Sequence, residues 1–173
     1  MPAHCTGPVP ARRPSLILRC IAGAAVLGVL ALTGCGVIPA DPDHTLDRVR
    51  ATKVLRLGAS DNPPLVVVED TADAPTGSEP DLARGFAERL GVEVEWVVGG
   101  ESELVGKLED GEVDMIVGGL LKSSPWEKRA SLTRPYATTD GPDGIERKHV
   151  MAVPLGENAM LSELERYLDE VAP

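Results

Sequence analysis

Apolar and polar positions along the chain alternate between the two-residue period of strands and the roughly four-residue period of helices. Leu82, Phe86 and Leu90 recur on one helical face, whereas 113–117 is a short, mostly apolar run. The pattern predicts strands at 54–58, 92–98 and 113–117, and helices at 45–51, 78–90, 102–110 and 158–171. Such alternation is typical of an α/β fold with a mostly parallel sheet flanked by helices, in which ligands bind beyond the carboxyl ends of the strands.

Two helix starts carry capping residues. Ser78, followed three residues later by Asp81, is typical of a capping box, and Asn158 is predicted to cap the last helix. The apolar positions of that last helix predict an inward face, made of Leu161, Leu164, Leu168 and Val171.

A basic and apolar N-terminal stretch ends in the tetrapeptide LTGC at 32–35. Its apolar run, 21–32, is shorter than the roughly 20 residues of a membrane span, so it predicts the core of a signal peptide. The tetrapeptide resembles a bacterial lipobox, in which Cys35 is acylated after cleavage, and this predicts a lipid anchor on the extracytoplasmic face of the cell membrane. The alternative is an ordinary secretory signal with an incidental cysteine. The predicted parts are a signal peptide over 1–34, a tether over 35–44 and a domain over 45–173.

Acidic residues outnumber basic ones by 27 to 17, which gives a formal net charge of −10. The predicted leader holds three arginines and no acid, so the remainder is more acidic still. An acidic protein has no electrostatic attraction to nucleic acid or to an anionic membrane surface, so we expect no nucleic-acid partner and membrane contact through the lipid alone. No spacing of His, Cys or acidic residues predicts a metal site, and no cofactor or catalytic group is expected.

Several short motifs between residues 45 and 136 follow one another in the order typical of one family. They are LRLG at 55–58 with Asp61, Pro63 and Pro64; GxExDLA at 77–83; LEDGEVD at 108–114; Gly118-Gly119; and TRPY at 133–136. Together they resemble the first lobe of the extracellular solute-binding proteins of family 3, the polar amino-acid-binding lipoproteins of ABC importers. The resemblance implies a single lobe of the type II periplasmic binding protein fold.

The chain departs from that family after Tyr136, where a second lobe would follow. Only residues 137–148 separate Tyr136 from a segment, 149–153, that resembles the returning strand. We therefore expect a Gly/Pro/Asp turn at 140–144 to replace the second lobe, with its flanking segments paired antiparallel at the edge of the sheet.

The resemblance implies that Arg129 clamps a ligand carboxylate, since a guanidinium offers two parallel donors. The alternative is an exposed arginine paired with Glu127 or Asp140. Ser124 would contact the same carboxylate, or it could cap the turn that begins at Pro125.

Two further residues match ligand-binding positions of the family. Gly119 would let backbone amides approach the ligand. Asp61 would lie near the ligand amine, although an Asx turn into the following Asn-Pro is the alternative.

The resemblance thus implies a lipid-anchored, non-enzymatic substrate-binding component of an ABC-type importer. Its ligand would be an amino acid or a similar small carboxylate, bound weakly in a half-site, and its partner a transporter permease. The alternative is an interaction or sensor module that docks on another membrane protein or pairs with a second copy, with ligand binding lost.

Overall fold

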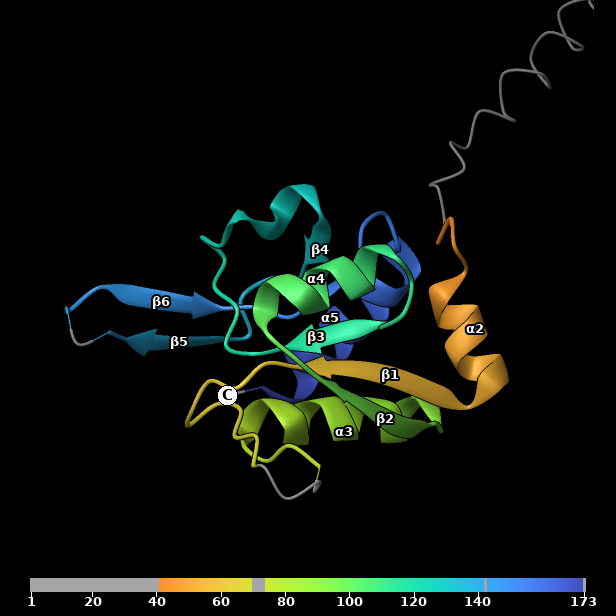
Figure 1. Cartoon of the computed structure of the whole chain (residues 1–173), viewed down its shortest axis with the longest axis horizontal. Helices are drawn as coiled ribbons and strands as arrows, with labels where there is room; N and C mark the ends of the chain where they lie inside the picture. The colour runs from red at the N-terminus through yellow and green to blue at the C-terminus, as the bar shows by residue number, and fades with distance from the viewer. Residues whose placement is uncertain (1–40, 70–73, 142, 173) are drawn as a thin grey trace, which may run out of the picture. The chain divides into compact units, whose positions relative to one another are not determined.

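A five-stranded sheet forms the centre of the computed structural model, which describes residues 41–69, 74–141 and 143–172 (Figure 1). The predicted signal peptide, Cys35 and most of the tether lie outside the described residues. The strands are ordered β2-β1-β3-β7-β4. Their bounds are β1 Val54–Ala59, β2 Glu93–Val98, β3 Met115–Val117, β4 Ala130–Leu132 and β7 Ala152–Pro154.

One strand of this sheet runs against the others. β1 pairs in parallel with β2 and β3, whereas β7 pairs antiparallel with both β3 and β4. The mostly parallel α/β sheet is confirmed, but the antiparallel strand was wrongly expected at the edge. Instead, β7 lies beside β3, joined to it through the pair Ile116↔Ala152, and β4 pairs with the other side of β7 and forms the edge of the sheet.

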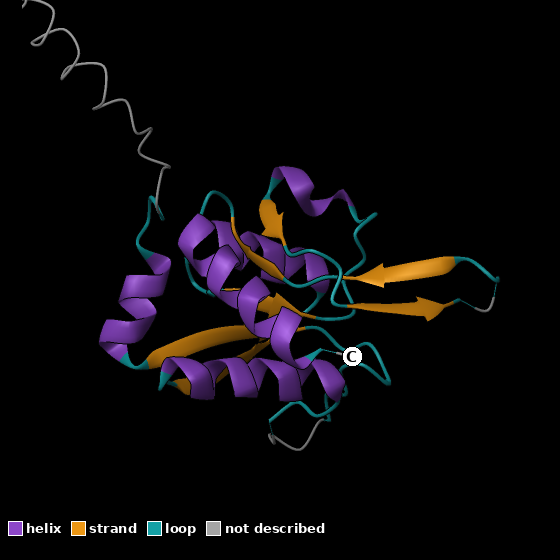
Figure 2. Cartoon of the chain, turned by 180° about the vertical axis from the view of Figure 1, so that it is seen from behind, coloured by secondary structure: helices purple, strands orange, loops and turns teal. Residues whose placement is uncertain are grey.

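Helices cover both faces of the sheet. Their bounds are α2 Thr45–Thr52, α3 Ser78–Leu90, α4 Glu101–Glu109 and α5 Asn158–Val171. Alternate β1 residues, such as Leu55 and Leu57, share one core with α2, α3 and α5, and Figure 2 shows α3 and α5 together on that side. On the opposite face, α4 packs Leu104 and Leu108 against Ile116. The period-two alternation of the strands thus separates two cores.

Two helix details differ from the sequence predictions. Gly77 precedes α3 in the capping position and no side chain caps it, so Ser78 lies inside the helix; at α5 the capping residue is Glu157. The buried face of α5 consists of Met160, Leu164, Tyr167 and Leu168, while Val171 is 47% exposed. The predicted face was wrong at its end because Met160 and Tyr167 supply the larger apolar surface.

A hairpin extends away from the sheet at the left of Figure 1. Its strands, β5 Ala137–Asp140 and β6 Glu146–His149, pair antiparallel from Ala137↔His149 to Asp140↔Glu146. The predicted antiparallel pairing is confirmed, but the pair forms a separate two-stranded sheet rather than extending the edge of the main one. The predicted strand 149–153 is divided between two strands. His149 ends β6 and Ala152 begins β7, while Val150 between them donates its N–H to the carbonyl of Leu120.

Two buried carboxyl groups connect the start of α2 with the start of α5. Glu157 accepts hydrogen bonds from the amides of Asp43 (2.8 Å) and Thr45 (2.9 Å), and Asp41 accepts one from the amide of Leu46 (2.8 Å). Burial, reinforced by the neighbouring Glu157, raises the pKa of Asp41 to about 6. The two acids thus satisfy helix N–H groups that would otherwise lack partners.

Candidate functional site

The carboxyl ends of β1 and β3 lie side by side and bring two loops together. The amide of Ser60, just after β1, donates to the carbonyl of Val117 at 3.0 Å. One residue pair further on, Asn62 Nδ2 donates to the carbonyl of Gly118 at 2.9 Å. The loop after β1 and the loop after β3 therefore form one surface, as expected for neighbouring parallel strands.

Glu79 holds the loop after β3 from beneath. Its side chain is fully buried, and its Oε2 accepts hydrogen bonds from the amides of Gly118 (2.8 Å) and Gly119 (2.9 Å). Its Oε1 accepts a hydrogen bond from the Tyr136 hydroxyl. Burial, together with the nearby charge of Glu79, raises the pKa of Tyr136 well above its usual range. One carboxylate thus joins three segments: the start of α3, the loop after β3 and the segment before the hairpin.

Sequence reasoning did not single out Glu79. The residue entered only as part of the GxExDLA motif and the presumed capping box. Its placement at the first turn of α3 is favourable for a carboxylate, because the helix dipole is positive there. That position was the one local sign of its role, since its partners lie 39 or more residues away.

Gly119 has a positive φ of +66°, which strains any other residue, and a side chain there would force Asn62 to move. An added Cβ would lie 2.1 Å from Asn62 Nδ2. The N–H of Gly119 donates a hydrogen bond to Glu79, so it is engaged within the protein. The contribution of Gly119 to the surface is the space left by its missing side chain.

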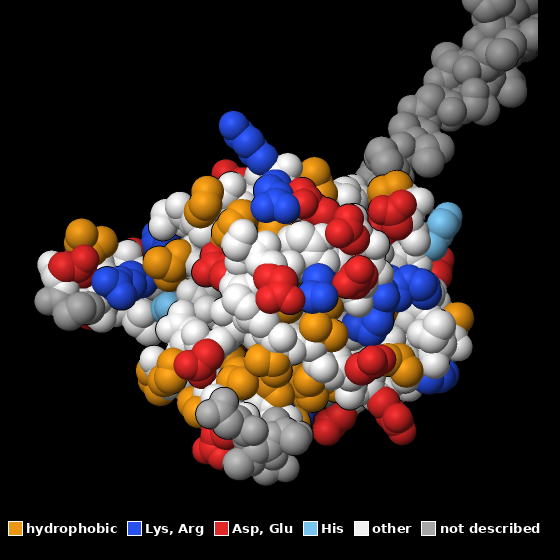
Figure 3. All heavy atoms as spheres, in the orientation of Figure 1, with side chains coloured by type: hydrophobic (Ala, Val, Ile, Leu, Met, Phe, Trp, Pro, Cys, Tyr) orange, Lys and Arg blue, Asp and Glu red, His pale blue; other side chains and the backbone are white. Residues whose placement is uncertain are grey.

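A hollow of ≈ 390 Å³ lies between this loop surface and the hairpin. The loops contribute Asn62, Pro63, Pro64, Leu65, Gly119 and Leu121, and the hairpin contributes Thr139, Asp140, Gly141, Arg147 and His149. Figure 3 shows hydrophobic side chains gathered at the lower left, over the loop that follows β1. The hollow therefore has one mainly apolar wall and one polar wall.

His149 is the most deeply buried polar group of this hollow. The residue is only 5% exposed, and its Nε2 lies 2.8 Å from Thr139 Oγ1. Its Nδ1 is buried and has no hydrogen-bond partner among the residues that the structure describes. Buried polar atoms of this kind are uncommon in folded proteins and cost about 1–3 kcal/mol when unsatisfied.

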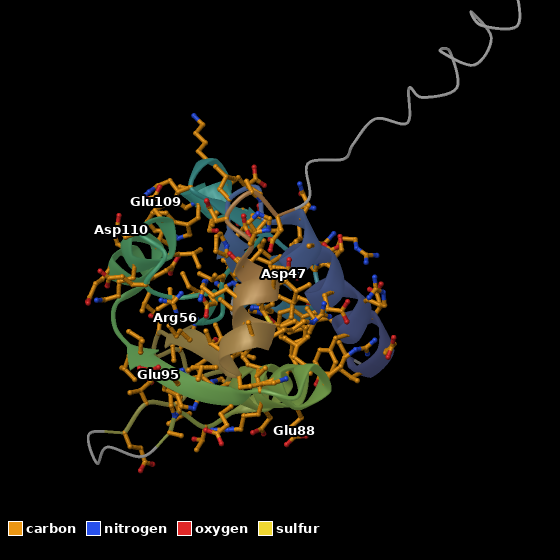
Figure 4. All side chains as sticks on the ribbon, turned by 90° about the vertical axis from the view of Figure 1, so that its right-hand side faces the viewer. Asp47, Arg56, Glu88, Glu95, Glu109 and Asp110 are labelled. Carbon is orange, nitrogen blue, oxygen red and sulfur yellow. The ribbon has the colours of Figure 1, made fainter. Side chains whose placement is uncertain are left out.

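Arg129 does not lie at this hollow. It pairs with Glu109, with Nε and Oε1 2.9 Å apart, and its guanidinium lies 5.6 Å from the ring centre of Trp126. The pair raises the pKa of Arg129 and lowers that of Glu109. Figure 4, viewed from the side opposite the hairpin, shows Glu109 and Asp110 at the end of α4. The expected partners of an unliganded Arg129, Glu127 or Asp140, were wrong.

Arg129 instead lines a second hollow of ≈ 360 Å³ together with Arg48 and Glu109. Arg129 and Gly119 therefore line different hollows, and the predicted carboxylate clamp stays a prediction. Ser124 precedes a short 3₁₀ helix, Pro125–Lys128, without capping it by a side-chain bond, and within the described part of the chain its buried Oγ has no partner.

Asp61 is exposed and uses one carboxylate oxygen within its own loop. Its Oδ1 accepts a hydrogen bond from the amide of Val68 at 2.9 Å, rather than from the next residues as an Asx turn would require. Its predicted contact with a ligand amine stays a prediction.

Within the described ranges, no group of three or more His, Cys, Asp or Glu residues is placed to hold a metal ion. Across the same part of the chain, no helix combines the length and apolar character needed to cross a bilayer.

The fold, the paired loops and the matched sequence define a solute-binding domain. The chain belongs to the bacterial extracellular solute-binding proteins, family 3, whose family model matches residues 55–172. It superimposes on the arginine-bound form of domain 1 from TmArgBP with a TM-score of 0.63 and 28% identity, covering 72% of this chain and 98% of that one. An ancestral cationic amino acid solute-binding protein shares the fold at 16% identity and a TM-score of 0.64, covering 73% of this chain and 93% of that one. The predicted family and its single-lobe fold are confirmed.

Curated relatives match a shorter part of the chain. A membrane-bound lytic murein transglycosylase F of Vibrio cholerae serotype O1 is 40% identical over 100 residues, which cover 56% of this chain and 18% of that protein. The transglycosylase F of Idiomarina loihiensis is 33% identical over 112 residues, covering 64% of this chain and 24% of that protein. The chain thus spans less than a quarter of the length of these relatives.

Proposed function

We propose that this domain binds a free amino acid, or a similar small carboxylate, outside the cytoplasm and without catalysing a reaction. Two findings support the ligand class: the family to which the chain belongs and the arginine-bound form of an isolated domain 1 at 28% identity. The second is informative because that neighbour is also a single lobe, and this chain covers 98% of it.

The observation that carries the proposal is the hollow at the carboxyl ends of β1 and β3. Its ≈ 390 Å³ falls within the range of about 300–1,000 Å³ that small-molecule sites occupy. The buried Glu79 fixes the loop on one side of it, so the site is formed before a ligand arrives. Pre-organisation of this kind lowers the entropic cost of binding.

We expect the affinity of this site to be low. Two-lobed sites enclose most of a ligand, and a micromolar site corresponds to about −8 kcal/mol. If half of those contacts are missing, roughly −4 kcal/mol remains, which is a millimolar dissociation constant. Such a protein would respond to abundant solutes rather than scavenge scarce ones.

The cellular role that fits this binding is the substrate-binding component of an ABC-type importer, anchored through acylated Cys35 and partnered by a permease. A Cys35→Ser substitution tests the anchor: the protein should move from the membrane fraction to the soluble extracytoplasmic fraction. Retention of the variant in the membrane would refute acylation at this residue.

A second candidate role is an interaction or sensor module on a membrane protein. The matches to membrane-bound transglycosylases favour it, since they place similar sequences in membrane-bound cell-wall enzymes by name. In this role the domain would dock on a partner or pair with a second copy. Light scattering of the purified protein over a hundredfold concentration range separates these two forms.

Thermal unfolding of the purified protein with each of the twenty L-amino acids at 20 mM tests the proposed function. A ligand at ten times its dissociation constant adds about 1.4 kcal/mol and should raise Tm by several degrees. The Arg129→Ala variant, measured in parallel, tests the predicted clamp: unchanged binding would agree with the separation of Arg129 from the hollow. No shift with any amino acid, in a protein that unfolds cooperatively, would refute amino-acid binding and favour the interaction module.

A further inference from the structure

The four residues that lead into α2, residues 41–44, form a strained turn. The amide of His44 donates to the carbonyl of Asp41 at 2.9 Å and closes the turn. Both residues have a positive φ, +35° at Asp41 and +53° at His44, a conformation that residues other than glycine rarely adopt. Contacts from elsewhere in the fold must therefore compensate for the strain of this backbone.

Glu157, at the start of α5, provides such contacts. Its carboxylate accepts hydrogen bonds from the amides of Asp43 and Thr45, which lie 112 or more residues away along the chain. Glu157 is fully buried, and Asp41 is 4% exposed and lies within hydrogen-bonding reach of it. The turn is thus held to the start of α5 through two neighbouring carboxyl groups.

The arrangement of acceptors requires a proton between these two groups. Asp41 Oδ2 accepts from the amide of Leu46 at 2.8 Å, whereas Oδ1 is buried and has no hydrogen-bond partner among the residues that the structure describes. Two ionised carboxylates offer acceptors only, but a proton on Oδ1 makes Asp41 a donor to Glu157. The pKa values move apart accordingly: burial raises that of Asp41 to about 6, and, against the effect of burial, the hydrogen bond from Asp41 lowers that of Glu157.

The charges that face the pair favour the protonated form. Glu157 and Asp47, which act on Asp41 from α5 and α2, are both acids and so oppose its ionisation. Arg48, also on α2, is bound to a different buried carboxylate, with an N–O distance of 2.6 Å.

Two further titratable side chains belong to the turn itself. Asp43 lines the second hollow, which Arg48 also lines. The ring of His44 lies 3.8 Å from Asp47, and both of these side chains are more than 70% exposed. Because His44 is exposed and titrates in the same range of pH as the buried pair, an experiment must separate the two.

From this geometry we propose that Asp41 and Glu157 form a pH-sensitive latch, which holds the turn at 41–44 on the start of α5 in acid and releases it as the pH rises toward neutrality. Once the proton is lost, two carboxylates lie side by side in a buried position, and the strained turn opens. Opening adds four residues, or about 13 Å of extended chain, to the segment that precedes the domain. That segment leads to the predicted lipid anchor, so the latch sets how far the domain can reach from the membrane at a given external pH.

The direction and the size of the effect follow from the pKa of Asp41 in the two forms. In the open turn Asp41 is solvated and has its ordinary pKa of 3.8, whereas in the closed turn the pKa is about 6. The closed form binds the proton more tightly, so its advantage is present below about pH 4 and is lost as the pH rises through 6. Linkage then gives a rise of about fiftyfold in the ratio of open to closed turns between pH 4 and pH 7.

Amide hydrogen exchange of the purified protein, followed by NMR, measures this opening. The amides of Asp43, Thr45 and Leu46 report it, because their acceptors are the two carboxyl groups. Their protection factors, which compare each amide with an unstructured chain at the same pH, should fall about fiftyfold from pH 4 to pH 7 and level off above pH 6. The amide of Ser60, bonded to Val117 beside the main sheet, should change by less than about threefold.

Three variants assign the titration to Asp41. In Asp41→Asn the side-chain amide can donate to Glu157 and accept from Leu46 without titrating, so the turn should stay closed at both pH values. Asp47→Asn is the matched control, since it makes the same change at an exposed acid of α2, and it should keep the fall. His44→Gln removes the histidine and should keep the fall as well.

The outcomes decide the proposal. A fall in protection that is lost in Asp41→Asn and kept in Asp47→Asn and His44→Gln supports the latch. Protection that does not depend on pH in the wild type, or a fall that survives in Asp41→Asn, would overturn it. A fall that disappears in either control variant assigns the titration to another group and overturns it too.

Discussion

Removing the Glu79 carboxylate should destabilise this domain more than any other single acidic substitution in α3. In Glu79→Ala, the amides of Gly118 and Gly119 and the hydroxyl of Tyr136 all lose their acceptor. Glu79 is fully buried, so water cannot replace the lost carboxylate without entering the core.

The magnitude follows from the number of donors. Each buried donor left unsatisfied costs about 1–3 kcal/mol, and large effects of single substitutions saturate near 4–5 kcal/mol. We therefore expect a loss of about 3–5 kcal/mol, a large part of the 5–15 kcal/mol that stabilises an ordinary domain. Glu79→Gln should lose only about 1 kcal/mol, because the amide oxygen can accept from the two glycines while its NH₂ group donates to Tyr136.

Urea unfolding, followed by circular dichroism, measures these free energies. Glu88→Ala is the matched control, since Glu88 is an exposed acid on the same helix (Figure 4) and should change stability by no more than about 0.5 kcal/mol. If Glu79→Ala lies within 1 kcal/mol of wild type, Glu79 does not hold the loop in the way its hydrogen bonds indicate.

Three further predictions concern backbone fit and pH. Gly119→Ala should lower the free energy of unfolding in urea by about 2–3 kcal/mol and abolish amino-acid binding. Its control is Gly111→Ala, since Gly111 has a similar positive φ of +69° but no neighbour within 4 Å; this variant should lose only about 1 kcal/mol and keep binding. Equal losses in the two variants would contradict the steric argument. The raised pKa of Tyr136 means that the folded state favours its neutral form, so the stability this gives is present below about pH 10 and lost above it. Ultraviolet titration should therefore show no ionisation of Tyr136 before unfolding, and early ionisation would refute its burial. Asp41 has a pKa raised to about 6, so it contributes stability that is present below about pH 4 and lost as the pH rises through 6, when it ionises beside Glu157. The Asp41→Asn variant should therefore match the Tm of the wild type at pH 4 and exceed it at pH 7. A difference in Tm that does not depend on pH would argue against this titration.

Most helices and strands could be predicted because their signals are local. The apolar positions of 82–90 repeat with the helical period, and α3 ends at Leu90, just before a glycine with positive φ. The last helix covers the predicted residues, Asn158–Val171. Its buried face was predicted less well, since the choice between Tyr167 and Val171 depends on what packs against the helix. Phe86 packs against Tyr167, with their ring centres 5.7 Å apart.

The candidate site was predicted only in part. Its location at the ends of β1 and β3, and the presence of Gly119 in it, followed from the alternation of strands and helices. Arg129 was expected there as well, but it pairs with Glu109, 20 residues away along the chain. Short-range spacing does not specify which of several acids an arginine meets, since that depends on how the 3₁₀ turn at 125–128 is oriented against α4.

By itself, the sequence determined the α/β class, the order of the elements and the family, because hydrophobic period and motif order are properties of neighbouring residues. Only the tertiary structure decided that β7 lies antiparallel inside the sheet and that Glu79 joins three segments. It also decided that the hairpin closes a hollow with His149 at its base. These features depend on contacts between residues distant in sequence, whose partners are set by the path of the whole chain and by which polar groups become buried together.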